Sequence, residues 1–182
     1  MSRRTYGRTA AVVAAMTALG GATTATALGA GSGGVAPGGT GGTTAAASSS
    51  GTFPIRGHHT YGDGLGAGRG HQGQDLLAKC GKPVVAALSG RVSYVSYHSA
   101  AGNYVVIHGS AGNPDTVYMH LSERASVRRG EKVAAGDSLG RVGRTGDASA
   151  CHLHFEMWSS PGWEKGGSLI DPLPYLKRWD RR

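Results

Sequence analysis

The chain is poor in the features that define several large classes of protein. It has only two cysteines and no Cys-x-x-Cys pair, which argues against a cysteine-rich zinc module. No amphipathic pattern of about ten or more residues follows the N-terminal segment, which argues against a helical bundle. The sequence also contains no motif typical of RNA or DNA binding. What remains is a glycine-rich chain with many short apolar runs, which favours a domain built from strands.

Residues 1–27 have the pattern of a secretory signal peptide. Arginines precede a short apolar run that ends near Gly20, and small residues that suit cleavage near Ala27 follow. The run is too short and too rich in alanine and glycine for a good membrane span. We therefore expect a secreted protein with no stable membrane insertion after cleavage. The arginine pair leaves open whether export uses the Sec or the twin-arginine route.

Residues 28–52 are uncharged and dominated by Gly, Ala, Thr and Ser, a composition that predicts a flexible linker. Residues 53–182 are long enough to bury one ordinary hydrophobic core and are expected to form a single domain. The net charge of +8 favours an anionic partner, although a charge that serves only solubility is an equally good interpretation. Nothing in the sequence indicates an oligomer, so we expect a monomer.

Six segments predict β-strands because they are rich in β-branched or aromatic residues, alternate partly in polarity and lie between turn residues. They are residues 83–87, 90–97, 103–108, 116–121, 138–142 and 151–157. The expected fold class is therefore all-β, with a compact antiparallel sheet. The glycine-rich stretch 57–70 is expected to be a long loop that leads into a functional site.

Segments 89–92 and 127–140 also resemble the strand rhythm of biotinyl and lipoyl carrier domains, which have a barrel-sandwich-hybrid fold. Those domains present a modified lysine on a tight hairpin between their two halves. No lysine occurs between Lys82 and Lys132, and Lys132 lies inside the repeat itself. We therefore interpret the rhythm as a feature of the architecture and expect no carrier function.

The spacing of histidines and carboxylates indicates a metal site. The segment His71-Gln-Gly-Gln-Asp75 contains Gly73, which disfavours a helix, and its two ends point the same way if it is extended. His152-Leu-His154 has the one-residue spacing of ligands on a strand. Two histidines and one carboxylate can hold Zn²⁺ tetrahedrally and leave the fourth position to water, as in hydrolytic sites.

Cys80 and Cys151 allow two interpretations. In an oxidising compartment an even number of cysteines suggests a disulfide. Closing a loop of about 70 residues would stabilise the fold by roughly 4 kcal/mol in the chain-entropy model. Such a bond would anchor the segment that carries His152. The alternative is a pair of thiolate metal ligands, which is disfavoured because histidine and aspartate ligands already suffice.

Six motifs occur in order along the chain. They are Gly70-His71-Gln-Gly-Gln-Asp75, Gly81-Lys-Pro-Val84, Gly90-Arg-Val92, Tyr118-Met-His120-Leu-Ser122, Gly140-Arg-Val-Gly-Arg-Thr-Gly146 and His152-Leu-His154-Phe-Glu156. This set resembles the M23 family of zinc metallopeptidases, the lysostaphin and LytM type of peptidoglycan endopeptidase. The resemblance extends over about residues 53–176 and depends on the combination, because His-x-x-x-Asp alone would be a weak signal.

The resemblance implies one Zn²⁺ per chain, bound by His71, Asp75 and His154. It implies that His120 and His152 are catalytic histidines that do not bind the metal. It also implies a compact LytM-like β domain with a groove along one sheet, in which a peptide of bacterial peptidoglycan would lie.

The resemblance leaves some residue roles open. His152 can accept a proton from the attacking water and pass it to the leaving amine, while His120 can orient the water or stabilise the oxyanion. Which of the two is the general base is not assigned. Glu156 is either an acceptor for a histidine N–H or an ordinary strand residue. Four histidines have no assigned role: His58, His59, His98 and His108.

One departure from the family pattern concerns the cysteines. Ala150-Cys151 precedes His152, where many members have Gly-Pro, and this fits an intrachain Cys80–Cys151 disulfide.

The favoured function is a secreted zinc metallo-endopeptidase that hydrolyses peptide bonds in peptidoglycan stems or cross-bridges. One alternative is a non-catalytic or latent module that binds or regulates the cell wall, which the intact His120 and His152 argue against. Another is a secreted zinc peptidase that acts on ordinary proteins. The sequence does not assign the scissile bond or distinguish remodelling of the cell's own wall from attack on other bacteria.

Overall fold

The computed structural model of the protein describes residues 51–68 and 70–181. The expected signal peptide and residues 28–50 of the expected linker lie outside the described residues. Gly51 and Thr52, the last two residues of that linker range, already pack on the domain. The Thr52 N–H donates to the Ala87 carbonyl at 2.9 Å, and a Cβ at Gly51 would lie 2.3 Å from the Trp179 ring. Within the described residues, no helix is long and apolar enough to cross a membrane.

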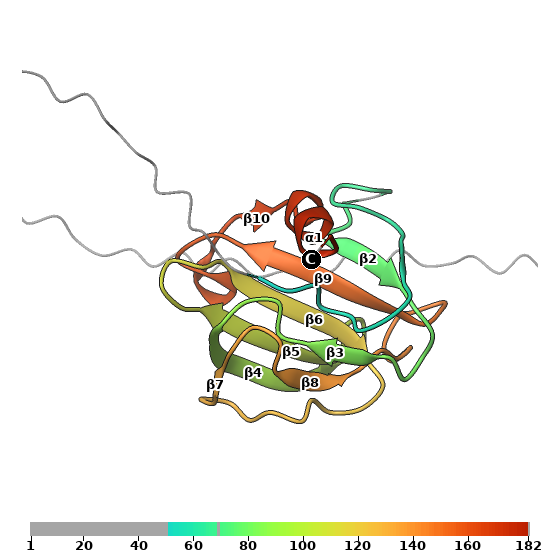
Figure 1. Ribbon diagram of the computed structural model, residues 1–182, viewed down its shortest axis with the longest axis horizontal. Coiled ribbons are helices and arrows are strands. Elements are labelled where there is room, and N and C mark those ends of the chain that lie inside the picture. The colour runs from blue at the N-terminus through green and yellow to red at the C-terminus, as the bar shows by residue number, and fades with distance from the viewer. Residues whose placement is uncertain (1–50, 69, 182) are drawn as a thin grey trace, which may run out of the picture. The chain divides into compact units, whose positions relative to one another are not determined.

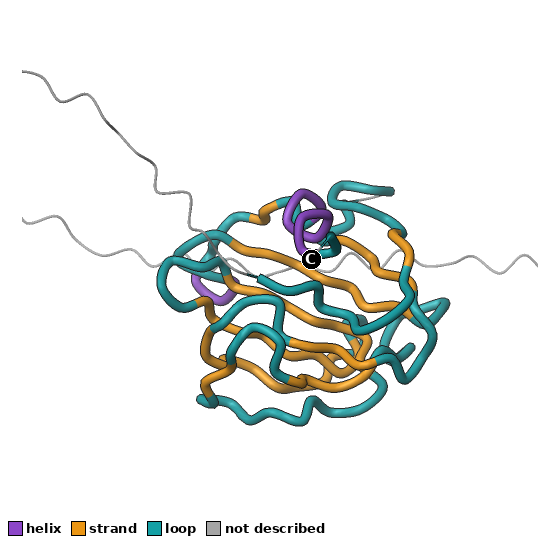
Figure 2. Tube along the Cα trace, viewed as in Figure 1, coloured by secondary structure: helices purple, strands orange, loops and turns teal. Residues whose placement is uncertain are grey.

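Antiparallel strands form most of the regular structure of this part of the chain (Figure 1 and Figure 2). The large sheet has the strand order β1-β2-β9-β6-β5-β4-β7, and β10 also pairs with β9. Its strands are β1 (Thr60–Tyr61), β2 (Gln74–Leu77), β4 (Gly90–His98), β5 (Gly102–Gly109), β6 (Asp115–Leu121), β7 (Lys132–Val133), β9 (His152–Trp158) and β10 (Leu169–Ile170). A second sheet pairs β3 (Pro83–Val85) with β8 (Ser138–Arg141). The predicted all-β, antiparallel fold class is confirmed.

The hydrophobic core lies on one face of the large sheet. Alternate residues of β5 and β9 point into it, among them Val105, Ile107, Leu153 and Phe155, which are at most 1% exposed. The small sheet contributes Val84 and Leu139 to the same core, and it is drawn in front of β4 and β5 in Figure 1. The short helix α1 (Leu173–Trp179) contributes Leu176 and Trp179. The period-two alternation of the strands thus puts every second side chain on the core side.

The opposite face of the large sheet carries the polar residues of the central strands. Asp75 on β2 pairs in register with His154 on β9, and His154 pairs with Met119 on β6. Side chains of register partners lie on the same face of a sheet. Val106 and Val117 are fully buried, yet they lie outside the core cluster. This second face therefore positions the candidate site and is itself partly covered.

Each of the six predicted strand segments contains a strand. Four short strands and helix α1 were not predicted. Strand β2 reads Gln-Asp-Leu-Leu and has no polar–apolar alternation, so periodicity does not reveal it. Helix α1 has only seven residues and Pro174 in its first turn, which is too short for a clear helical period. The described residues of the glycine-rich stretch, 57–68 and 70, are largely loop, as expected, apart from the two residues of β1.

Candidate metal centre

Three potential ligand atoms converge on the open face of the large sheet. His71, Asp75 and His154 each offer one ligand atom, and the three atoms lie within 4.8 Å of one another. The Asp75 Oδ1 atom is 3.0 Å from His71 Nε2 and 3.0 Å from His154 Nδ1. The two imidazole rings stand nearly edge-on, with centroids 4.6 Å apart. This is a two-histidine, one-carboxylate donor set of the kind that binds Zn²⁺.

The pairing of β2 with β9 brings these residues together across a large gap in sequence. Asp75 lies opposite His154, and Gly73 passes so close to β9 that a Cβ there would lie 2.4 Å from the Phe155 carbonyl oxygen. Only glycine fits at this crossing. The extended segment predicted from His71 onwards begins only at Gln74, so His71 reaches the cluster from a loop rather than from the strand.

In each candidate ligand histidine, the ring nitrogen that faces away from Asp75 makes a hydrogen bond that orients the ring. His71 Nδ1–H donates to the Gly64 carbonyl at 2.9 Å. His154 Nε2–H donates to Glu156 Oε1 at 3.1 Å. In the neutral rings these bonds leave the lone pairs of His71 Nε2 and His154 Nδ1 directed at the cluster, as metal ligation requires.

Glu156 is buried and forms hydrogen bonds with both the candidate ligand His154 and Trp158. Its side chain is almost fully buried, and Oε2 accepts a hydrogen bond from Trp158 Nε1–H at 2.7 Å. Of the two interpretations that the sequence left open, this geometry matches an acceptor for a histidine N–H. Trp158 was not singled out from the sequence, although its i+2 spacing from Glu156 on one strand was the available signal.

His120 and His152 lie beside the three candidate ligands. Their ring centroids are 4.6 Å apart, and His152 Nε2 lies 3.7 Å from Asp75 Oδ1. His120 Nδ1–H donates to the Thr145 carbonyl at 2.8 Å, and His152 Nδ1–H donates to the Ala150 carbonyl at 3.0 Å. Both rings therefore keep Nε2 available, as a proton acceptor when neutral and as a donor when protonated.

The backbone of His120 adopts an uncommon conformation. Its φ angle is +62°, at a shift in register between β5 and β6. Residues other than glycine rarely occupy this region, and doing so costs about 1–3 kcal/mol. Thr145 supports the turn, because its hydroxyl donates to the Leu121 carbonyl at 2.7 Å and accepts from the Asn103 N–H at 2.9 Å. In this conformation the His120 ring lies 6.2 Å from the His154 ring, measured between centroids.

The electrostatics of the cluster favour a cation. Burial lowers the pKa of His154, but hydrogen bonds to Asp75 and Glu156 outweigh it and raise the pKa to about 9. Burial alone would raise the pKa of Asp75, but the His154 hydrogen bond and the neighbouring histidines hold it below its usual value. Burial lowers the pKa of His120, against the hydrogen bond to Thr145. The carboxylates of Asp75 and Glu156, which together hold a proton on His154, would stabilise a bound metal ion in the same way.

The disulfide prediction is confirmed, because Cys80 and Cys151 are bonded. The bond joins the turn after β2 to the residue just before His152, and it leaves neither sulfur as a thiolate ligand. The histidines without an assigned role lie outside the cluster. His59 stacks on Phe53 with ring centroids 4.0 Å apart and pairs with Asp180 at 3.3 Å.

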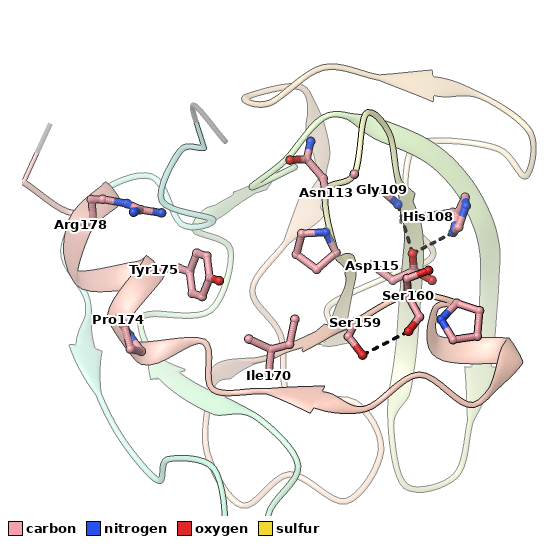
Figure 3. A pocket seen from close by; sticks show the side chains of 13 residues that line it. His108, Gly109, Asn113, Asp115, Ser159, Ser160, Ile170, Pro174, Tyr175 and Arg178 are labelled. Atoms are coloured by element: carbon pink, nitrogen blue, oxygen red, sulfur yellow. Dashed lines mark hydrogen bonds and ion pairs between the residues drawn. The ribbon is translucent and has the colours of Figure 1, made fainter. Parts of the chain in front are cut away.

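A pocket of about 670 Å³ lies where β6 begins and β9 ends, and its lining does not include the candidate ligands. Figure 3 shows the residues that line it. His108 and Asp115 line it on one side, and Tyr175 and Arg178 of α1 line it on another. His108 Nδ1–H donates to Asp115 Oδ1 at 2.8 Å, and Asp115 Oδ2 accepts from the Trp163 N–H at 2.9 Å. Asp115 thus ties neighbouring loops together.

Comparison with known proteins assigns the chain to one family. The model of peptidase family M23 matches residues 69–172. The chain is 41% identical over 89 residues to the peptidoglycan DD-endopeptidase ShyC of Vibrio cholerae, covering 49% of this chain and 20% of that protein. It is 33% identical over 122 residues to lysostaphin of Staphylococcus simulans, covering 66% of this chain and 24% of that protein. The chain thus spans about a fifth to a quarter of the length of these relatives.

Solved structures agree with this placement. The catalytic domain of lysostaphin from Staphylococcus simulans superimposes with a TM-score of 0.59 at 32% identity, covering 65% of this chain and 92% of that domain. A zinc-containing peptidase from Vibrio cholerae superimposes with a TM-score of 0.58 at 27% identity, covering 68% of this chain and 39% of that one. Because the family model matches more than half of its residues, the chain belongs to peptidase family M23.

Proposed function

We propose that the protein is a secreted zinc metallo-endopeptidase that hydrolyses peptide bonds in the stems or cross-bridges of bacterial peptidoglycan. The observation that carries this proposal is the convergence of five side chains on one sheet face: His71, Asp75, His120, His152 and His154. The names of the relatives support the substrate class, because they include a peptidoglycan DD-endopeptidase and a glycyl-glycine endopeptidase.

His71, Asp75 and His154 would hold one Zn²⁺ through Nε2, Oδ1 and Nδ1. Three protein ligands suit a catalytic site, because a structural site would fill the fourth position with another side chain. When bound, zinc would supply a Lewis acid that polarises the scissile carbonyl and activates water at neutral pH. The hydrogen bonds to Gly64 and Glu156 would keep the ligand rings in place.

His120 and His152 would move the protons of the reaction. Each Nε2 can take a proton from the attacking water and return it to the leaving amine, because each Nδ1 is already committed to a backbone carbonyl. The lowered pKa of His120 favours its neutral form, which is the form that accepts a proton. A protonated ring beside the cluster would also stabilise negative charge on the carbonyl oxygen.

Export is the second part of the proposal. Residues 1–27 would direct secretion, and residues 28–52 would separate the domain from that signal, with Gly51 and Thr52 packed on the domain. The mature protein would then meet its substrate in the cell wall as a monomer.

The test is release of free amino groups from purified peptidoglycan by the mature protein, with and without a chelator. We expect release that stops with the chelator, returns with Zn²⁺, and is lost in Asp75→Ala and His154→Ala. His58→Ala is the control, because His58 is exposed and lies outside the cluster. Cleavage of casein without any release from peptidoglycan would overturn the substrate class, and release that resists the chelator would overturn the zinc assignment.

A further inference from the structure

Aromatic side chains lie on the same sheet face as the candidate metal centre. Register partners run straight across β4, β5, β6 and β9 as Tyr94, Val106, Val117 and Glu156. Side chains of such partners share a face, as do residues two apart on one strand. Tyr104, two residues before Val106, therefore lies on the face that carries His154, two residues before Glu156.

Trp163 completes this aromatic group from another part of the chain. It lies in the connection between β9 and β10, and its ring centroid is 5.5 Å from that of Tyr94 and 6.3 Å from that of Tyr104. Asp115 holds the connection down, because it accepts the Trp163 N–H and leaves no room for a side chain at Gly162, where a Cβ would lie 2.4 Å from Oδ2. Tyr94, Tyr104 and Trp163 are named the aromatic platform below.

The aromatic platform combines apolar rings with a charged rim. All three of its residues are half-buried, so none of them belongs to the sealed core. The Arg129 guanidinium lies over the Tyr94 ring at 5.3 Å, and the Tyr94 hydroxyl donates to the Glu164 carboxylate. Rings with apolar faces and polar edges suit a ligand that is itself apolar on its faces and polar at its rim.

The distance from the metal centre indicates which part of a substrate reaches the aromatic platform. Strand β5 is two strands from β9 and β4 is three, so the platform lies about 10–14 Å to the side of His154 at about 4.8 Å per strand. An extended peptide covers that distance in about three or four residues. For a scissile bond that lies three or four residues along a peptidoglycan stem, this distance reaches the place where the stem joins its sugar.

We propose that the aromatic platform binds the sugar end of a peptidoglycan fragment while its peptide lies across the metal centre. A pyranose ring presents C–H groups on its faces and hydroxyl groups at its rim, which matches the aromatic faces and the polar rim formed by Arg129 and Glu164. This inference rests on the proposed function, because it assumes that a wall peptide is cut at the cluster. It adds a subsite that selects substrates with sugar attached.

The test compares cross-linked wall peptides that carry their disaccharide with the same peptides after the sugar has been removed. In Tyr104→Ala, we expect the KM for the sugar-bearing substrate to rise about fivefold, as for the loss of one stacking contact. On the sugar-free substrate its kcat/KM should match that of the wild type. Tyr104→Phe should behave as the wild type, because it keeps the ring.

Tyr97→Ala is the matched control, because Tyr97 is an exposed tyrosine on the same strand as Tyr94, three residues away and so on the other face. It should leave both substrates unaffected. Equal losses on both substrates in Tyr104→Ala, or no loss on either, would overturn the sugar subsite while leaving the peptidase intact. Failure of the wild type to cut either substrate would instead overturn the proposed function, and the subsite with it.

Discussion

Glu156 accepts hydrogen bonds from His154 and Trp158 at the same time, and it is buried. Glu156→Gln keeps the shape but replaces one carboxylate oxygen with an NH2 group, which can only donate. If the NH2 group faces His154 Nε2, that nitrogen must become the acceptor, and the proton moves to Nδ1, where the metal would bind. We expect zinc affinity to fall about 10–100-fold.

Competition with a chelator of known affinity measures this change. Glu164→Gln is the control and should bind zinc as the wild type does, because Glu164 is exposed and bonds the Tyr94 hydroxyl rather than a candidate ligand. Unchanged affinity in Glu156→Gln with an intact fold would show that Glu156 does not orient His154.

The raised pKa of His154 predicts how metal binding depends on pH. Zinc must displace the proton that the metal-free site holds on His154 up to about pH 9. Affinity should therefore rise with pH, by up to about tenfold per unit, and level off above pH 9. The raised pKa also stabilises the metal-free fold below pH 6.5, and this contribution is lost as the pH rises through 9.

Titrations at several pH values between 6.5 and 9.5, with thermal melting of the metal-free and the zinc-loaded protein, check both statements. A zinc affinity that does not change over this range would show that His154 carries no proton in the metal-free site.

At the scale of elements, the turn before β5 packs against the loop that carries Thr145, and this loop positions the His120 ring. A Cβ at Gly102 would lie 2.4 Å from the Thr145 carbonyl oxygen, the atom that His120 Nδ1–H binds. Gly102→Ala should push this oxygen away and lower kcat at least tenfold, while the three candidate ligands still bind zinc.

Gly112→Ala is the matched control for this backbone change. Gly112 also has a positive φ, +79° against +65° for Gly102, but a Cβ there would meet nothing within 4 Å. It should cost about 1 kcal/mol of stability and leave kcat unchanged. Equal kcat values for the two variants would show that Thr145 does not position His120.

The Cys80–Cys151 disulfide links two segments that are 71 residues apart in the sequence. Replacing both cysteines by serine should lower the free energy of unfolding by about 2–4 kcal/mol. Zinc should still bind with unchanged stoichiometry, because neither sulfur is a ligand. Denaturant unfolding and metal analysis of the variant measure the two effects, and loss of zinc from a folded variant would contradict the ligand set.

At the scale of the whole domain, the segment before β1 closes the end of the core. Phe53 is 6% exposed and stacks on His59. A fragment of residues 54–182 should be less stable than one of residues 51–182 by roughly 3–5 kcal/mol, the usual effect of removing a buried phenylalanine. Urea unfolding of the two fragments tests where the domain begins, and equal stability would place its start after Phe53.

Much of the fold follows from local pattern, as the six strand segments show. Each has enough β-branched and apolar residues to reveal period-two alternation, whereas Gln74-Asp-Leu-Leu77 does not. Strand β2 is nevertheless decisive, because its pairing with β9 puts Asp75 opposite His154. The five site residues could be named from motifs, but the carbonyl acceptors Gly64 and Thr145 could not, since main-chain acceptors have no signature in sequence.

The covalent chain by itself determined which chemical groups are present and which neighbours on a strand share a face, because both depend only on residue type and short spacing. The combination of His71-x-x-x-Asp75 with His152-x-His154 therefore indicated a metal site directly. Only the tertiary structure decided that His120 lies beside His152 and that Tyr104 and Trp163 form one platform on the same face. Contacts between distant residues depend on strand order, register and bulges, which local periodicity does not specify.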